Sequence, residues 1–350
     1  MKIHEKYILR CIELGKNGLG STAPNPMVGC VIVYNDTIIG EGFTSPYGGP
    51  HAEVNAIRAV ADPSLLAKAT LYVTLEPCSH YGKTPPCADL IIQNKIPKVV
   101  IGISDPHDKV KGQGIERLRS TGCEVITPVL ERAVREHHRR FLTFHEKKRP
   151  YIILKWAETA DGFIAPDPNK RMAQPEPFWI TNRYSRQRVH QWRSEEHAIL
   201  VGTGTVLEDN PRLSTRSWKG KSPIRIVLDR ELRIPEDFNV FNEEAQTLVL
   251  SSKDHASEER PGVSYQQADL SKDPVIAICE ALYKNNIQSV LIEGGATILK
   301  AFIDADIWDE ARIFIGPGSF GSGLKAPILK GTEKCRLEIG KDLLKILRND

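Results

Sequence analysis

The sequence reads HAEVNAIRAV over residues 51–60 and EPCSHYGKTPPC over residues 76–87. These stretches supply His51, Cys78 and Cys87, with Glu53 close to the histidine. The proline, glycine and serine residues around them favour loops rather than a packed core. One imidazole and two thiolates are the kinds of donor that zinc prefers. The two stretches therefore predict a zinc site.

The expected site is catalytic. A catalytic zinc typically has three protein ligands and leaves its fourth position to water, whose pKa the metal lowers. We expect His51, Cys78 and Cys87 to be the ligands. Glu53 lies two residues after His51, and such neighbours on a helix do not share a face, so we expect Glu53 to move protons instead. This arrangement is the signature of zinc nucleobase deaminases.

One feature departs from that signature. Eight residues, 79–86, separate the two cysteines, whereas the signature has two. The longer loop carries His80 and Lys83, which could reach a substrate. Two prolines precede Cys87 and an apolar run, which predicts that Cys87 begins a helix, where its thiolate is favoured. The alternatives are a structural zinc site, which would normally have a fourth protein ligand, and buried thiols without metal.

A family resemblance becomes specific at this point. PNPMVGCVIV (24–33), HAEVNAI (51–57) and TLEPCSHYGKTPPC (74–87) resemble the bifunctional riboflavin-biosynthesis deaminase/reductase, whose long cysteine loop separates it from tRNA and cytidine deaminases. The resemblance implies an N-terminal cytidine-deaminase-like three-layer α/β/α domain, in which Asn25 contacts the pyrimidine. Thr44 stands where the family usually has a histidine, so one substrate contact departs from the family pattern.

Length and composition describe an ordinary globular protein. The 350 residues suggest two domains, and 41% hydrophobic and 26% charged residues suffice for sizeable cores. A net charge of +3 gives no strong polyanion signal. Seven scattered cysteines favour a reducing compartment over a disulfide framework. Neither a signal peptide nor an apolar run of transmembrane length is recognisable, so we expect a cytoplasmic protein without a membrane partner.

The first half alternates helices and strands. Tyr7–Leu14 has helical spacing, and two strands, 29–34 and 37–43, predict a hairpin around Asn35 and Asp36. Further strands are expected at 70–75, 98–103 and 123–127, and helices at 88–94, 114–120 and 129–144. This order predicts a mixed, largely parallel sheet covered on both faces.

A basic stretch lies before the expected domain boundary. The arginine, lysine and histidine residues between Arg132 and Arg149 could form a nucleic-acid patch. We favour a solvated helix face leading into a linker, because no strongly basic domain accompanies the stretch, and we expect no nucleic-acid partner. The composition shift at 146–150 places the boundary between domains 1–146 and 147–350.

The second half has six expected strands: 151–156, 194–201, 224–229, 247–251, 289–293 and 310–315. Two of them run into glycine turns that precede helices, Gly202 and Gly204 before 205–208, and Gly294 and Gly295 before 296–303. A glycine turn that opens a helix suits a phosphate group. Neither turn matches the dinucleotide-binding fingerprint, and a tight turn that merely requires glycine explains each equally well.

The resemblance extends through this half. LKWAETADG (154–162), FWIT (178–181), HAILVGTGTVLEDNPRLSTR (197–216), PIRIVLDR (223–230) and LIEGG (291–295) resemble the family's reductase half, which implies a dihydrofolate-reductase-like α/β domain that uses NADPH. The implied cofactor contacts are Ala157, Trp179, Thr205, Asp209, Arg230, Gly294, Gly295, Ala296, Thr297, Ile298, Leu299, Lys300 and Ala301. The implied substrate contacts are Arg193, Leu213, Arg216 and Glu293, with Lys155 and Asp161 near the ribose.

The chemistry of these residues agrees with that role. Arg193 and Arg216 are cations that a sugar phosphate needs, and Arg230 would favour NADPH over NADH by accommodating the 2′-phosphate. The plainer interpretation makes them surface arginines in exposed ion pairs. A proline-rich loop, 166–177, replaces the Gly-x-Ser segment common in the family.

The sequence thus predicts a bifunctional zinc hydrolase and NADPH-dependent oxidoreductase, with one Zn²⁺ per chain. Residues 1–146 would deaminate 2,5-diamino-6-(5-phosphoribosylamino)pyrimidin-4-one, with Glu53 as general acid/base. Residues 147–350 would reduce the ribosyl group to give 5-amino-6-(5-phosphoribitylamino)uracil, and we expect a homo-oligomer, a dimer or a tetramer. One rival is a zinc deaminase that acts on RNA and has a non-reductase C-terminal domain. Another is a non-catalytic sensor of metal and nucleotide.

Overall fold

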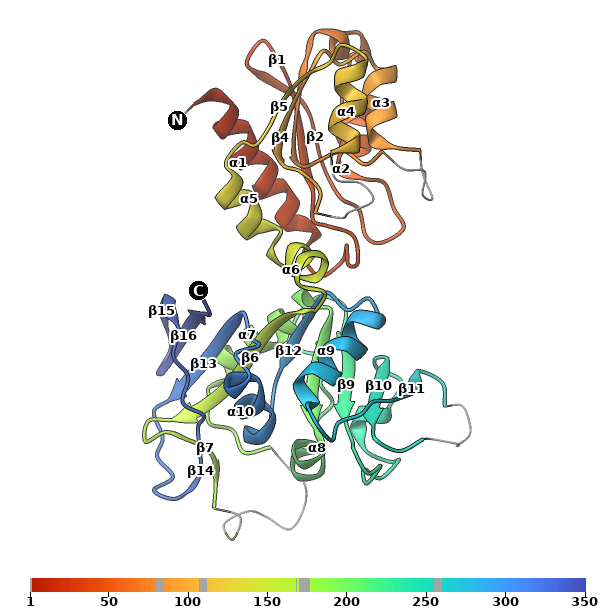
Figure 1. The fold of residues 1–350 in the computed structure, drawn as a ribbon. Helices are drawn as coiled ribbons and strands as arrows, with labels where there is room; N and C mark the ends of the chain where they lie inside the picture. The colour runs from red at the N-terminus through yellow and green to blue at the C-terminus, as the bar shows by residue number, and fades with distance from the viewer. Residues whose placement is uncertain (1, 80–84, 107–111, 168, 170–176, 255–259) are drawn as a thin grey trace. The chain divides into compact units, whose positions relative to one another are not determined.

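The computed structural model describes residues 2–79, 85–106, 112–167, 169, 177–254 and 260–350. The chain divides into two compact units, Met1–Lys148 and Arg149–Asp350 (Figure 1). Each unit has its own sheet and its own apolar core.

The N-terminal unit is built on a five-stranded sheet of order β2-β1-β3-β4-β5. β1 is antiparallel to both of its neighbours, and β3, β4 and β5 are parallel, so the predicted mixed sheet is confirmed. Asn35 and Asp36 form the turn of the predicted hairpin, with the positive φ values of 47° and 57° that a two-residue turn of this kind requires. The strands are β1 Gly29–Tyr34, β2 Thr37–Phe43, β3 Thr70–Leu75, β4 Lys98–Ile103 and β5 Glu124–Ile126.

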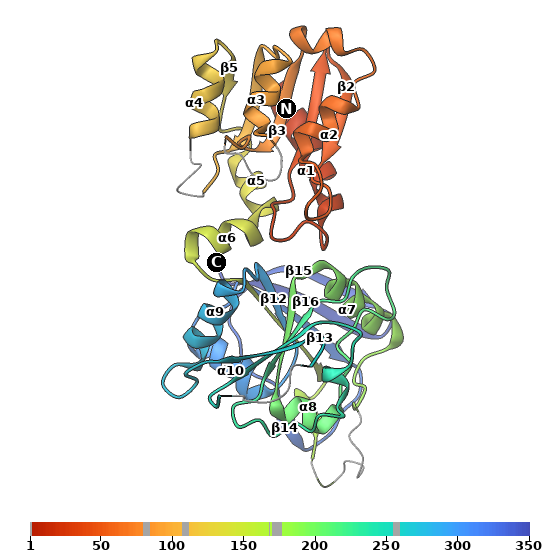
Figure 2. The same cartoon turned by 90° about the vertical axis from the view of Figure 1, so that its right-hand side faces the viewer.

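Helices cover both faces of this sheet. α1 and α5 lie on one face, and Figure 2 looks onto the opposite face, which α2, α3 and α4 cover. α1 packs closely on β1, because a Cβ added at Gly29 would lie 1.8 Å from the Cys11 carbonyl oxygen. The helices are α1 Ile3–Gly15, α2 Ala52–Arg58, α3 Cys87–Gln93, α4 Gln113–Ser120, α5 Glu131–His137 and α6 Arg139–Lys147, with short 3₁₀ turns at Lys16–Gly18 and Pro63–Lys68.

The single helix predicted over 129–144 is wrong, because the chain forms two helices, α5 and α6, with a break at His138. His137 and His138 are both buried. His137 Nε2 lies 2.6 Å from the Met27 carbonyl oxygen, to which it donates, and His138 Nε2 lies 3.0 Å from Thr74 Oγ1. The spacing of apolar residues cannot reveal such a break, because the break is accompanied by buried hydrogen bonds of two successive polar side chains.

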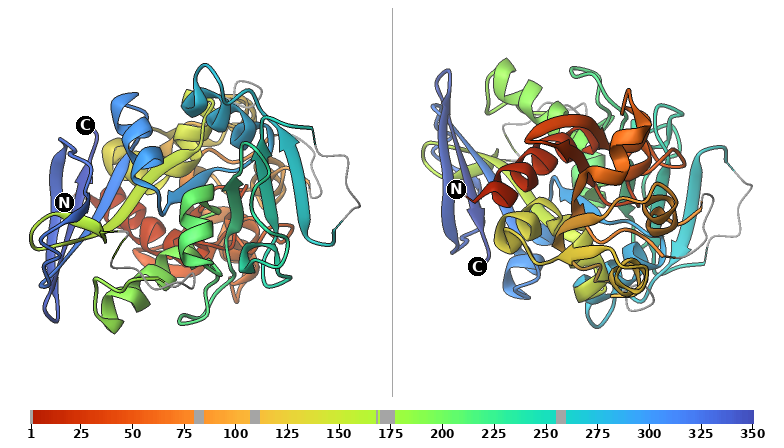
Figure 3. Two further views of the ribbon diagram at one scale, coloured as in Figure 1. Left: turned by 90° about the horizontal axis from the view of Figure 1, so that it is seen from below. Right: turned by 90° about the horizontal axis from the view of Figure 1, so that it is seen from above.

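The C-terminal unit contains a nine-stranded sheet of order β11-β10-β9-β8-β12-β6-β13-β16-β15. The strands from β11 to β13 are parallel, whereas β16 and β15 are antiparallel additions. Figure 3 shows β11 and the β15–β16 hairpin at opposite edges. The strands are β6 Tyr151–Thr159, β8 Ala198–Gly202, β9 Ile224–Leu228, β10 Thr247–Ser251, β11 Val263–Gln267, β12 Ser289–Ile292, β13 Glu310–Gly316, β15 Thr332–Ile339 and β16 Asp342–Arg348.

Helices and a small second sheet complete this unit. The strand predicted over 194–201 begins only at Ala198, because the preceding helix continues to Glu195. The remaining elements are α7 Arg183–Glu195, α8 Thr203–Asp209, α9 Pro274–Lys284, α10 Ala296–Asp304, a 3₁₀ turn at Asn239–Phe241, and a pair of strands, β7 Phe163–Pro166 and β14 Gly323–Lys325.

No helix among the described residues has both the length and the apolar character needed to cross a membrane.

Candidate functional site

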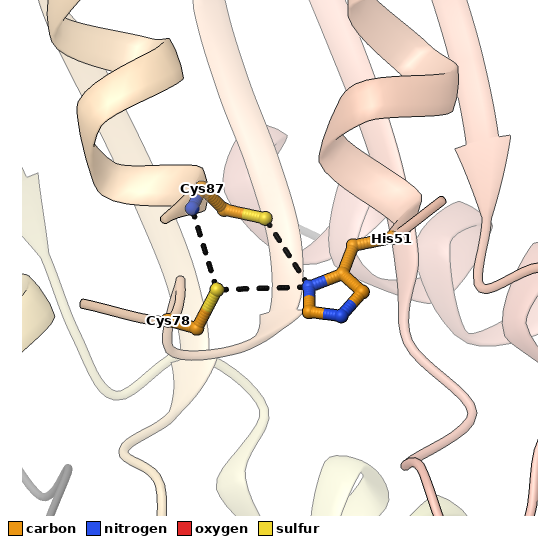
Figure 4. Close-up of side chains that lie close together, drawn as sticks. All are labelled: His51, Cys78 and Cys87. Carbon is orange, nitrogen blue, oxygen red and sulfur yellow. Dashed lines mark hydrogen bonds between the residues drawn. The ribbon is translucent and has the colours of Figure 1, made fainter. Parts of the chain in front are cut away.

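Three potential metal ligands converge in the N-terminal unit. His51 Nδ1 lies 3.6 Å from Cys78 Sγ and 3.3 Å from Cys87 Sγ (Figure 4). The three ligand atoms lie within 4.8 Å of one another, and no other group of three or more His, Cys, Asp or Glu residues with this geometry occurs in the described part of the chain.

The local backbone explains this convergence. His51 is the N-cap residue of α2 and has an extended conformation, and Cys78 follows the end of β3. Cys87 is the first residue of α3, which confirms the predicted helix start. The Cys87 N–H donates to Cys78 Sγ at 3.3 Å. The expectation that His51 and Glu53 lie together on a helix needs correction, because the helix starts at Ala52.

The donor set fits zinc. The ligand atoms of a tetrahedral zinc, with Zn–S near ~2.3 Å and Zn–N near ~2.0 Å, lie about 3.5–3.8 Å apart, close to the measured nitrogen–sulfur separations. Two thiols and one imidazole are also a soft donor set of the kind that zinc selects. Within the described ranges, no fourth His, Cys, Asp or Glu joins this group.

Proton affinities in this cluster are strongly perturbed. Hydrogen bonding from Cys87, followed by that from His51, lowers the pKa of Cys78 to about 4 despite burial. The pKa of the Cys87 thiol is raised, chiefly by its hydrogen bond with Cys78. A bound divalent cation would be the largest local charge and would deprotonate both thiols.

Glu53 is the acid/base candidate beside the ligands. Its side chain is only 4% exposed. Burial, followed by the negative charge of Cys78, raises the pKa of Glu53 to about 7. A carboxyl group with a pKa near neutrality can both accept and return a proton at physiological pH.

The predicted deaminase substrate contacts are only partly described. Asn25 lies in the segment before β1, and its N–H donates to the Thr22 carbonyl oxygen at 2.8 Å. This segment is bonded to the one that leads into His51, because the Tyr47 N–H donates to the Ser21 carbonyl oxygen at 3.1 Å. His80 and Lys83 lie outside the described residues, and all three substrate contacts stay predictions.

Thr44, at the position of the family's usual histidine, has a structural contact of its own. Its side chain is buried, and its Oγ1 accepts the Val28 N–H at 3.1 Å. The Thr44 N–H in turn donates to the Val28 carbonyl oxygen at 3.0 Å. The hydroxyl thus joins the end of β2 to the segment that contains Asn25.

A second cluster of charged residues lies in the C-terminal unit. Arg193, on the last turn of α7, binds both carboxylate oxygens of Glu293, with distances of 2.9 Å from Nε and 2.8 Å from Nη2. Lys155 Nζ lies 3.5 Å from the same carboxylate. Leu154 and Ile292 are register partners in β6 and β12, so the next residue of each chain segment, Lys155 and Glu293, reaches the same level of the sheet.

This cluster includes one residue, His190, that the sequence analysis missed. His190 and Arg193 lie three positions apart on α7, and both contact the carbonyl oxygen of Ser214, at 2.9 Å from His190 Nδ1 and 3.3 Å from Arg193 Nη1. Burial and then the charges of Arg193 and Arg216 lower the pKa of His190 to about 4. A histidine at i−3 from a predicted functional arginine shares its helix face, and this spacing was the available signal.

Leu213 and Arg216 flank that carbonyl. Leu213 is buried and has a positive φ of 55°. Burial and the charge of Arg193 lower the pKa of Arg216, which places Arg216 in the electrostatic field of the cluster. The structure thus brings together four predicted substrate-binding residues, Lys155, Arg193, Arg216 and Glu293, whereas Leu213 packs in an apolar cluster.

The two glycine turns face each other. They follow the adjacent strands β8 and β12, and a Cβ added at Gly202 would lie 2.5 Å from Ile298 Cδ1. A Cβ added at Gly294 would lie 2.9 Å from Thr205 Oγ1. α8 and α10 both begin without a side-chain cap, so their first N–H groups suit the phosphates of a dinucleotide. The paired turns therefore fit NADPH.

Other predicted cofactor residues lie around these turns. Ala157 lies in β6, and Asp209 is the last residue of α8. The Trp179 ring is largely exposed and has the Arg186 guanidinium 4.6 Å from its centroid. Arg230 follows β9 and has an exposed side chain 3.9 Å from Glu231. Their cofactor contacts, like those of residues 295–301, stay predictions.

Asp161 has a structural role that the sequence analysis did not foresee. Its carboxylate accepts hydrogen bonds from Thr159 Oγ1 and from the N–H groups of Phe320 and Gly321. These bonds join the turn after β6 to the segment before β14. The proposed contact with the ribose stays a prediction. Most of the 166–177 loop lies outside the described residues.

Part of the basic stretch before the boundary is paired with acidic residues. Arg135 Nη2 lies 2.7 Å from Glu146, and Arg139 Nη1 lies 2.8 Å from Glu136. These pairs on exposed helix surfaces support the interpretation as a solvated face.

Comparison with known families divides the chain in the same order as the fold. Residues 1–103 match the family model described as the cytidine and deoxycytidylate deaminase zinc-binding region. Residues 150–342 match the model described as the RibD C-terminal domain.

Relatives match nearly the whole chain. The riboflavin biosynthesis protein RibD of Aquifex aeolicus (strain VF5) is 39% identical over 326 residues, which cover 92% of this chain and 89% of that protein. RibD of Escherichia coli (strain K12) is 34% identical over 347 residues, covering 94% and 92%.

Solved structures agree with these matches. A diaminohydroxyphosphoribosylaminopyrimidine deaminase/5-amino-6-(5-phosphoribosylamino)uracil reductase from Thermotoga maritima is 40% identical, with a TM-score of 0.86, and covers 99% of this chain and 98% of that one. Acinetobacter baumannii RibD in one crystal form is 32% identical, with a TM-score of 0.87 and the same coverage. These similarities confirm the predicted fold class, a cytidine-deaminase-like domain followed by a reductase domain.

Proposed function

Since the chain belongs to the family of RibD riboflavin-biosynthesis proteins, we propose that its two units carry out consecutive reactions on one phosphoribosyl pyrimidine. The chain is a bifunctional enzyme with a zinc-dependent deaminase domain and an NADPH-dependent reductase domain. Our proposal assigns the deaminase to residues 1–146 and the reductase to residues 147–350.

The first reaction is the hydrolytic deamination of 2,5-diamino-6-(5-phosphoribosylamino)pyrimidin-4-one. His51, Cys78 and Cys87 would hold the zinc, which supplies a Lewis acid that lowers the pKa of water. Glu53 would accept a proton from the attacking water and return it to the nitrogen that leaves as ammonia. The burial of Glu53, which raises the pKa of its carboxyl group, supports this role. Asn25 would orient the pyrimidine through its side-chain amide.

The second reaction opens the ribosyl group to a ribityl group. NADPH supplies the hydride, and the chain supplies binding and orientation. The N–H groups at the two glycine turns would hold cofactor phosphates. Arg193 and Arg216 would bind the substrate's anionic group, while Glu293 holds Arg193 and Lys155 in place. His190, with its lowered pKa, stays neutral and keeps its hydrogen bond with the Ser214 carbonyl group.

One observation carries the proposal more than any other. Three zinc-type ligands converge within 4.8 Å, and a buried carboxyl group with a raised pKa lies beside them. A structural zinc site does not require a proton-transfer group beside its ligands. This combination supports hydrolysis rather than mere metal binding.

The assay that tests the whole proposal supplies the phosphorylated diaminopyrimidine with and without NADPH. We expect ammonia release in both conditions and loss of nicotinamide absorbance only when NADPH is present. Ammonia release without any NADPH oxidation would contradict the assigned reductase. No ammonia release from the diaminopyrimidine, together with normal NADPH oxidation on a substrate deaminated in advance, would isolate a defect in the first unit.

Glu53→Gln tests the acid/base assignment. The variant should keep one zinc per chain, because glutamine changes no ligand, and should release ammonia about 10²–10⁴-fold more slowly, the range for removing a general acid/base. Zinc is measured by elemental analysis and ammonia by a coupled assay. Reduction of the deaminated intermediate by the same variant is the control. Ammonia release at the wild-type rate would refute the assignment.

The rival interpretation as an RNA deaminase is not favoured, because residues 150–342 match the RibD C-terminal domain. We propose a small-molecule pyrimidine as the only class of substrate.

We also propose a cytoplasmic location, which the seven free cysteines support. A homo-oligomer is proposed as well, supported by the exposed edge strand β15, which could pair with a second copy. Analytical ultracentrifugation would measure it.

A further inference from the structure

We propose that α4 is a positioning element for the metal centre, and that Arg117 on this helix joins the two ends of the loop that separates the cysteine ligands. The inference rests on the proposed assignment of Cys78 and Cys87 as zinc ligands. It concerns residues outside the ligand set, and it is carried by three separate contacts between α4 and the ligand segments.

The first contact is made by Glu76, two residues before Cys78. α4 begins at a glycine N-cap, Gly112, which has no side chain to satisfy the first N–H groups. The buried Glu76 carboxylate takes that place. Its Oε1 accepts the N–H groups of Gly114 and Ile115 at 2.9 and 3.2 Å, and its Oε2 accepts the Gly112 N–H at 3.0 Å. The segment before Cys78 thus supplies the cap of α4.

The second contact is a close approach of backbones. A Cβ added at Gly114 would lie 2.1 Å from the carbonyl oxygen of Pro77, the residue directly before Cys78. Only glycine permits this approach without a shift of one segment, so the first turn of α4 packs directly against the peptide that leads to the ligand.

The third contact spans the loop. Arg117 Nη1 donates to the carbonyl oxygen of Ser79 at 3.4 Å, and Arg117 Nε lies 2.6 Å from Asp89 Oδ1. Ser79 directly follows Cys78, and Asp89 lies two residues after Cys87 on α3. One guanidinium therefore contacts both ends of the loop.

These contacts matter because the loop is long. Eight residues separate Cys78 from Cys87, and holding the ends of a longer loop together costs more conformational entropy. Groups that orient ligands without touching the metal commonly contribute about 10–100-fold to metal affinity. The Arg117 side chain is 43% exposed, against 12% for Asp89, and an ion pair with one solvent-exposed partner contributes modestly to global stability. Metal retention and folding stability should therefore respond differently to its loss.

The test measures zinc release from the intact, zinc-loaded chain to a chromophoric chelator. Arg117→Met keeps much of the side-chain bulk and removes both contacts. We expect zinc release about 10-fold faster, with the thermal unfolding midpoint nearly unchanged. Asp89→Asn should act in the same direction, and the two effects should be non-additive because the residues share one contact. Arg117→Lys keeps a charge opposite Asp89 and should recover part of the retention.

Arg119→Met is the matched control. Arg119 lies on the same helix, and its Nη2 donates to the Val125 carbonyl oxygen at 3.3 Å, away from the ligand segments. This variant should release zinc at the wild-type rate. Zinc release from Arg117→Met and Asp89→Asn within about twofold of wild type, below the usual range for such groups, would overturn the inference. If wild-type protein holds zinc and Cys78→Ser loses it, that result leaves the proposed function standing. A wild-type chain that binds no zinc would overturn both.

Discussion

The Arg193 guanidinium binds the Glu293 carboxylate at two points, with 2.9 Å from Nε to Oε1 and 2.8 Å from Nη2 to Oε2. Both side chains are largely buried. Burial alone would raise the pKa of Glu293, but Arg193 and Lys155 lower it to about 2. The carboxylate therefore stays ionised at physiological pH and fixes two cations at the end of the sheet.

Glu293→Gln should destabilise the C-terminal unit and impair reduction. The variant leaves Arg193 and Lys155 buried without their shared anion, which for a buried pair costs about 3–5 kcal/mol. All five tryptophans of the chain lie in this unit, so tryptophan fluorescence during urea unfolding reports on it alone. Ammonia release, the reaction of the other unit, should be retained.

An exposed pair in the same unit provides the matched control. Arg212 Nη1 lies 3.1 Å from Glu244, and both side chains are well exposed. Glu244→Gln should change the free energy of unfolding by about 0–1 kcal/mol. Equal effects of the two substitutions would show that the burial of Glu293 has no energetic consequence.

His190 should make the C-terminal unit less stable in mild acid. Its pKa is about 4 in the folded chain against its usual 6.5, so between these values the unfolded chain binds a proton that the folded chain does not. Stability therefore decreases as the pH falls from about 6.5 to about 4. His190→Asn keeps a donor for the Ser214 carbonyl group but cannot titrate. Between pH 7 and pH 4.5, the free energy of unfolding of the variant should decrease by about 2 kcal/mol less than that of wild type. Parallel pH profiles would contradict the prediction.

Gly294→Ala should weaken NADPH binding selectively. Gly294 has a φ of 142°, and a Cβ there would lie 2.9 Å from Thr205 Oγ1 and Cγ2. The resulting strain is about 1–3 kcal/mol. If displacement of the turn relieves this strain, the dissociation constant of NADPH should rise roughly 5- to 150-fold. Gly318→Ala is the control, since Gly318 lies outside the two glycine turns and a Cβ there would meet nothing within 4 Å. Fluorescence titration measures the NADPH affinity of both variants. Equal affinities would refute the assignment of the glycine turns as the phosphate-binding site.

The sequence predicted most central strands because these strands are continuous apolar runs. Residues 70–75, 98–103 and 247–251 were placed with their observed bounds, as expected for strands buried on both faces. The hairpin β15–β16 was missed. β15 is exposed along nearly its whole length, so no buried face gives it an apolar period. The break between α5 and α6 was missed because hydrogen bonds of His137 and His138 fix it.

The metal ligands were predictable because zinc requires particular residue types, and His51, Cys78 and Cys87 converge as expected. Arg193, Lys155 and Glu293 were expected only from the family resemblance, and they also lie together. His190 was not foreseen, since its only signal was its position three residues before Arg193, and it belongs to no distinctive motif. The role of Asp161 in bonding to residues 320 and 321 depends on two segments far apart in the chain, and no local pattern reveals such a contact.

The register of β6 against β12 has a further consequence. Lys155 and Glu293 meet because Leu154 and Ile292 are partners in adjacent parallel strands. A slip of one residue would send one of these side chains to the opposite side of the sheet. A molecule that pairs these strands wrongly during synthesis would therefore lose the contact between Lys155 and Glu293, so the correct register is needed to assemble this charged cluster.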